Sequence, residues 1–162
     1  MEKFINNIRN ISNEEIFIVY ILIIFSGYII YLISNLIILK TLSSFIKKTS
    51  TQTDDILIEN KVFNTVPFLI TLIFFYNFKN FIPWSILIER LIISVITIII
   101  IISINRFINA LNEIYLKSKY SNKLNIKSYT QVLKLIVNIF GLITILSFLI
   151  GKSPIYLLSG IG

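Results

Sequence analysis

Residues 16–39 form an uninterrupted apolar run without a charged side chain. In a helix that rises 1.5 Å per residue, a run of about 24 residues is longer than the hydrocarbon core of a bilayer, which is about 30 Å thick. A cleavable signal peptide would instead have an apolar core of about 7 to 15 residues, followed by a small-residue cleavage site. The run therefore predicts a transmembrane helix that stays in the membrane.

Three further apolar segments follow, over residues 62–78, 86–104 and 132–150. Together with the first they predict an all-α, polytopic membrane protein with four transmembrane helices, because a helix satisfies its backbone hydrogen bonds inside lipid. Composition agrees: 56% of the residues are hydrophobic and only 14% are charged, against roughly 25% charged residues in soluble domains. The expected four-helix transmembrane region is residues 16–150.

Two of these spans carry residues that need special placement. The second span is short and contains Pro67, so we expect the helical turn before it to lengthen it. In the fourth span, the long side chain of Lys134 can carry its charge to the headgroups, which avoids a cost of about 3 kcal/mol at the bilayer centre. Single glycines in the first and fourth spans, Gly27 and Gly141, would let neighbouring helices approach closely.

The distribution of Lys and Arg predicts the orientation of the chain. Ten of the 15 basic residues lie in or beside the connections between the first and second spans and between the third and fourth. By the positive-inside rule both connections face the cytoplasm, which leaves residues 1–15 as an N-terminal periplasmic segment. The net charge of +7 favours membrane lipids as partners, and not nucleic acid, because the basic residues lie in short loops instead of along one stripe.

The types of residue present exclude several kinds of chemistry. The chain has no cysteine and no histidine, which rules out disulfides, Cys/His zinc sites and imidazole bases. Asp54 and Asp55 are adjacent, so on a helix their side chains diverge by about 100°. We expect them in a first turn capped by Thr53, and a metal or acid–base pair is the less favoured alternative. No catalytic, metal or cofactor site, and no enzymatic activity, is expected.

The connection from Arg106 to Gln131 continues the helical pattern of the third span. Its apolar residues recur at three- and four-residue spacing: Phe107, Ile108, Leu111, Ile114 and Tyr115. Two interpretations remain open. The apolar face lies on the inner leaflet of the membrane, or the connection is a helical hairpin whose apolar stripe packs internally.

Three short motifs stand out along the chain. KTSTQTDDILIENKVF, with a proline a few residues later, supplies Thr49, Thr51, Asp54, Asp55 and Pro67. NIKSYTQVLKLI supplies Lys127, Tyr129, Gln131 and Lys134. GKSPIYLLSGIG supplies Ser153, Pro154, Ser159, Gly160 and Gly162. In order and spacing the three motifs resemble those of the small-conductance mechanosensitive channel family, in its miniconductance branch, although Thr53 stands where that family usually has a tryptophan.

The resemblance implies both a function and an assembly. In that family a pore-lining helix starts after the Ser-Pro pair, a β-rich domain and a cytoplasmic vestibule follow, and the subunits form a homoheptamer. This chain would then be the tension-sensing part of a channel subunit in the bacterial cytoplasmic membrane, which releases ions and small osmolytes on hypoosmotic shock. Residues 151–162 would be the truncated start of a fifth, pore-lining helix beginning at Pro154, and Ser159, Gly160 and Gly162 would form its small-residue face.

Three other classes of membrane protein are alternatives to a channel. A non-conducting scaffold or regulatory fragment also fits a chain whose pore helix is incomplete. A secondary transporter is less favoured, because the spans have no acidic residue near their centres and no clear internal repeat. An intramembrane enzyme is the least favoured, since no carboxylate pair or activated nucleophile lies in the apolar core.

Overall fold

The structure is a computed structural model that describes residues 13–48, 52–81, 85–118 and 126–160. These residues form α-helices, short 3₁₀ turns and their connections, without a strand among them. The elements are α2 (Asn13–Lys48), α3 (Gln52–Glu59), η1 (Val62–Thr65), α4 (Val66–Asn77), η2 (Lys79–Phe81), α5 (Ser85–Leu116), α6 (Ile126–Ile150) and α7 (Pro154–Ser159). The all-α prediction is confirmed for the described part of the chain.

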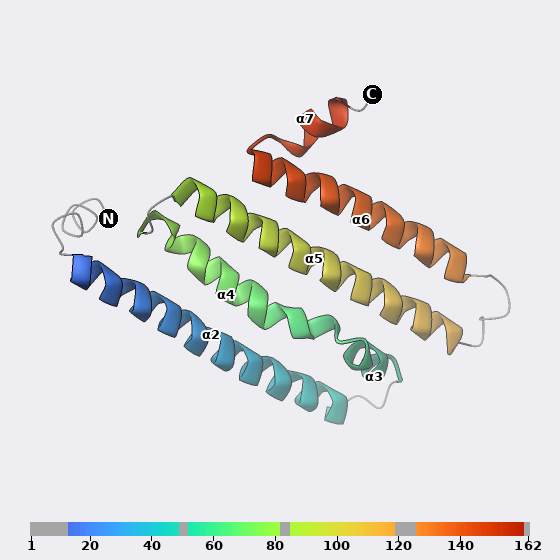
Figure 1. Cartoon of the computed structure of the whole chain (residues 1–162). Helices are drawn as coiled ribbons and strands as arrows, with labels where there is room; N and C mark the ends of the chain where they lie inside the picture. The colour runs from blue at the N-terminus through green and yellow to red at the C-terminus, as the bar shows by residue number, and fades with distance from the viewer. Residues whose placement is uncertain (1–12, 49–51, 82–84, 119–125, 161–162) are drawn as a thin grey trace.

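The long helices lie side by side in one layer, in the order α2, α4, α5, α6 (Figure 1). Each runs antiparallel to its neighbour, and α7 turns back over the end of α6. Large apolar side chains remain exposed along the layer, for example Ile24 at 65% and Leu36 at 66% on α2. Such a surface needs lipid or another protein around it, because water disfavours contiguous apolar area of this extent.

Three helices are long and apolar enough to cross a membrane: Ile16–Thr41, Ser85–Leu116 and Ile126–Ile150. Three of the four predicted spans are therefore confirmed as helices long enough to cross a membrane. The second predicted span is part of a helix pair, Thr53–Glu59 and Val62–Asn77, bent by 44°. This pair is either one broken span or a re-entrant segment. The helical segment expected before residue 62 is present as α3, but its axis is bent away from that of α4.

The helices extend beyond the predicted spans at the end of the layer where α5 meets α6 (Figure 1). Helix α5 continues to Leu116, and α6 begins at Ile126, six residues before the predicted span. In this extension Ile108 is buried, whereas Phe107 and Leu111 are 45% and 47% exposed. The apolar stripe is thus divided: Ile108 packs internally, as the hairpin interpretation expects, whereas Phe107 and Leu111 are open to lipid, as the inner-leaflet interpretation expects.

Small residues bring α5 and α6 together. Gly141 and Ser147 on α6 are buried. A Cβ atom added at Gly141 would lie 2.7 Å from Cγ1 of Ile101, which is far inside ordinary contact distance. Gly27 on α2 faces Phe75 of α4 in a similar way. The prediction that both glycines permit close helix approach is confirmed, and it matches how helices associate in lipid.

The predicted orientation leads to a labelling experiment. The chain has no cysteine, so a single introduced cysteine is the only thiol that can react. Lys152→Cys, exposed in the turn after α6, should react with a membrane-impermeant maleimide in intact cells. Lys127→Cys, exposed near the start of α6, should react only after permeabilisation. Labelling of Lys127→Cys, and not of Lys152→Cys, in intact cells would show that the chain has the opposite orientation.

Candidate functional site

The most irregular backbone in the described part of the chain is the bend between α3 and α4. Lys61 adopts the left-handed conformation, with φ of 54° and ψ of 34°, which is uncommon for a residue other than glycine. Its N–H donates to the Ile58 carbonyl at 2.8 Å, and α3 ends there. Pro67 lies in the first turn of α4, where its missing N–H does no harm. The helix therefore breaks and restarts within a few residues.

Hydrogen bonds to α5 hold this bend in place. Arg106 Nη1 donates to the Lys61 carbonyl at 3.1 Å, which satisfies the oxygen at the break. The Thr65 and Ser103 hydroxyl oxygens lie 2.6 Å apart, and Thr65 is buried. Buried polar groups are costly unless they are paired, so these contacts fix where α4 crosses α5.

A second set of polar contacts ties α3 to α5. Asn60 Nδ2 donates to Glu113 Oε2 at 2.8 Å, and Lys117 forms an ion pair with the same carboxylate at 2.9 Å. The hydrogen bond to Glu113 raises the pKa of Lys117 above its ordinary value, an effect opposed by partial desolvation. Lys117 is half exposed, so the pair contributes little to stability by itself.

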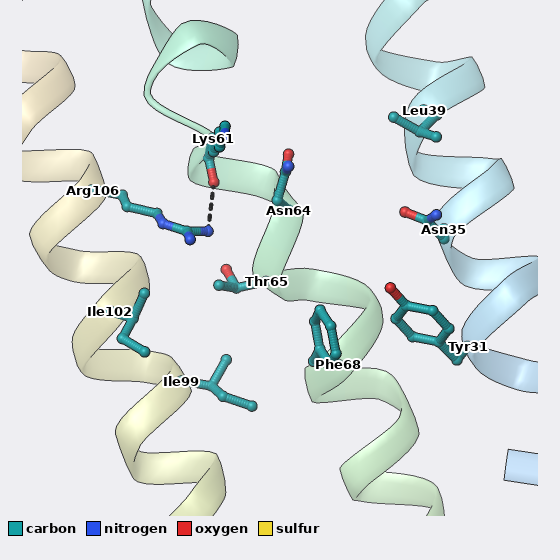
Figure 2. A pocket seen from close by; sticks show the side chains of 10 residues that line it. All are labelled: Tyr31, Asn35, Leu39, Lys61, Asn64, Thr65, Phe68, Ile99, Ile102 and Arg106. Carbon is teal, nitrogen blue, oxygen red and sulfur yellow. Dashed lines mark hydrogen bonds between the residues drawn. The ribbon is translucent and has the colours of Figure 1, made fainter. Parts of the chain in front are cut away.

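The bend leaves a cavity of about 660 Å³ between α2, α4 and α5. Figure 2 shows Tyr31, Asn35 and Leu39 approaching it from α2, while Arg106 reaches across from α5 to the Lys61 carbonyl. Six of the ten lining residues carry a polar or charged group, and four are apolar. The residues are Tyr31, Asn35, Leu39, Lys61, Asn64, Thr65, Phe68, Ile99, Ile102 and Arg106.

The turn between α6 and α7 is the second irregular point. Gly151 has φ of +76°. The N–H groups of Gly151 and Lys152 donate to the carbonyls of Phe148 and Ser147, at 3.1 Å and 2.9 Å. This pairing is a Schellman motif, which usually needs glycine at the left-handed position. Helix α6 therefore ends sharply.

The next helix starts at once. Ser153 Oγ accepts a hydrogen bond from the Tyr156 N–H at 3.2 Å, as an N-cap does. Pro154 follows as the first residue of α7, a position that suits its fixed φ. The predicted helix start at Pro154 is confirmed. The Gly-Lys-Ser-Pro sequence is thus a stop signal for one helix followed by a start signal for the next.

A polar seam joins α5 and α6 near their connection. Asn105 Nδ2 donates to Asn138 Oδ1 at 2.7 Å, and Lys134 Nζ donates to Asn109 Oδ1. Lys134 therefore has a partner on the neighbouring helix, in addition to the headgroups expected from the sequence. Hydrogen bonds of this type between helices in lipid contribute about 0.6 kcal/mol on average.

The other predicted residues lie apart from the cavity. Asp54 and Asp55 are in the first turn of α3, as expected. Thr53 is not their N-cap, because α3 already begins at Gln52. Lys127, Tyr129 and Gln131 are exposed along the first turns of α6. Ser159 and Gly160 are exposed at the end of α7, and Thr49, Thr51 and Gly162 lie outside the described residues.

Within the described ranges, no group of three acidic side chains is placed to hold a metal ion. A scan against protein-family models matches none, and neither curated proteins nor solved structures give a match. The resemblance drawn from the three motifs therefore stays a prediction. Lys61 in the bend and its α5 partners Ser103 and Arg106 were missed as a site. Their only signal in the sequence is that Lys61 and Arg106 flank apolar spans and that Ser103 lies near the end of one.

Proposed function

We propose that this chain is the tension-sensing transmembrane part of a mechanosensitive channel subunit in a bacterial cytoplasmic membrane. The observation that carries the proposal is the single layer of apolar helices, with large side chains exposed instead of gathered in a core. A transporter needs a polar site enclosed among its helices. A layer one helix thick offers instead a large perimeter to lipid.

Tension acts through area. A conformation that occupies more membrane area is favoured by the product of tension and the extra area, and only a difference between two states can shift their equilibrium. The bent pair α3–α4 offers such a difference, because straightening it would change the tilt and in-plane area of that segment. Helix α7, joined to α6 by a fixed turn, would pass the movement on to the pore of a homoheptamer.

The bend itself is the measurable quantity. Asp55→Cys and Asn77→Cys place spin labels on exposed positions at the two ends of the bent pair. In the protein reconstituted into liposomes, osmotic swelling should lengthen the distance between these labels, because tension favours the straighter form. Pulsed electron-spin resonance measures that distance with and without the osmotic gradient.

A pair of labels on one helix serves as the control. Tyr28→Cys and Leu39→Cys lie on exposed positions of α2, which is continuous, so their separation should stay constant under swelling. A lengthening at the bend alone supports a sensor. Identical distances at the bend up to the lytic tension would contradict the proposal and favour a static scaffold.

A further inference from the structure

The cavity at the bend is lined by two cations and no acid. Lys61 and Arg106 line it, and no Asp or Glu is among its lining residues. Neither cation forms an ion pair with a carboxylate elsewhere in the described ranges. Arg106 uses one N–H for the Lys61 carbonyl, and guanidinium has five donors in all. The cavity therefore has positive charge and donors to spare.

Neutral donors add to this. Asn35 and Asn64 line the same cavity from α2 and from η1. Their side-chain amides form no hydrogen bond to another described residue. Amide N–H groups and a fork-shaped guanidinium suit the tetrahedral oxygens of a phosphate.

Four of the other lining residues are apolar. Leu39, Phe68, Ile99 and Ile102 form that part of the wall. Tyr31 lies eight residues before Leu39 on α2, which is about 12 Å further along the helix. The cations and Leu39 lie at or just past the ends of the predicted spans, at headgroup level, whereas Phe68 and Ile99 lie further inside the spans, toward the bilayer interior.

We propose that this cavity binds an anionic phospholipid, with its phosphate held by Lys61 and Arg106 and its acyl chain against the apolar wall. A lipid fits better than a soluble anion because four of the ten lining residues are apolar and offer nothing to a hydrated ion. An anionic headgroup fits better than choline or ethanolamine because no carboxylate is present to receive their cation. The site requires only insertion in a membrane, so it stands or falls independently of tension sensing.

Native mass spectrometry of the protein released from mixed phosphatidylglycerol and phosphatidylcholine nanodiscs tests this proposal. The wild type should retain phosphatidylglycerol preferentially. The double variant Lys61→Gln/Arg106→Gln should bind it about 30-fold more weakly, as expected for the loss of two cations. The matched control Lys127→Gln removes an exposed cation from the same end of the layer, outside the cavity, and should bind as the wild type does.

Two further variants distinguish a loss of lipid binding from misfolding of the double variant. Lys61→Gln alone changes an exposed side chain and leaves the backbone break in place, so it should fold and bind roughly 5-fold more weakly. Arg106→Lys keeps the charge and should retain most of the binding. Equal retention of both lipids by the wild type, or undiminished binding by the double variant, overturns the proposal.

A separate arm distinguishes the lipid from a free anion. In phosphatidylcholine nanodiscs, millimolar inorganic phosphate should leave the thermal midpoint of the protein unchanged, whereas phosphatidylglycerol should raise it. Equal stabilisation by both would assign the cavity to a soluble anion and overturn the lipid assignment.

Discussion

Replacing Gly141 with leucine is expected to separate α5 from α6. The new side chain would occupy the space now filled by Ile101, whose Cγ1 lies 2.7 Å from the position of the first added carbon. Overpacking of this kind costs about 1–3 kcal/mol, and here the displaced group lies in the middle of the layer. Formation of a disulfide between Asn105→Cys and Asn138→Cys, whose native side chains are hydrogen-bonded, reports the separation, and the yield should fall severalfold.

Two controls make this result specific. A Cβ at Gly160 would meet only backbone oxygens, at 3.6 Å and 3.7 Å, so Gly160→Leu should leave the cross-linking yield unchanged. Adding Ile101→Ala to Gly141→Leu frees the space and should restore much of the yield. An undiminished yield in Gly141→Leu would mean that the α5–α6 contact is looser than described.

The spans could be predicted because the bilayer fixes the length of an uncharged segment. Residues 16–39, 86–104 and 132–150 each lie within a continuous helix. Residues 62–78 did not behave in this way, because the chain breaks just before them at Lys61. A lysine in the left-handed conformation carries no local sequence signal, whereas a glycine would have marked the break. The bend was therefore invisible to pattern alone.

The cavity was beyond prediction for a different reason. It needs Asn35 from α2, Lys61 from the bend and Arg106 from α5 together, and their proximity depends on which helices are neighbours in the layer. The charges of the loops predicted the orientation of the chain in the membrane, but they do not indicate which helices contact one another. The turn before α7 could be predicted more easily from the sequence, because glycine, serine and proline act there through their own backbone preferences.

Replacing Gly151 with valine is expected to misdirect α7 while leaving α6 intact. The residue has φ of +76°, and a Cβ there would contact the guanidinium of Arg90 on α5, so a β-branched side chain meets both strain and a clash. Strain of this type costs about 1–3 kcal/mol. Spin labels at Leu146→Cys and Ser159→Cys, both exposed positions, should change from one distance to a broad distribution. Gly151→Asn, which tolerates the left-handed conformation better, should broaden it less. A single unchanged distance in Gly151→Val would show that the capped start of α7, rather than the glycine, sets its direction.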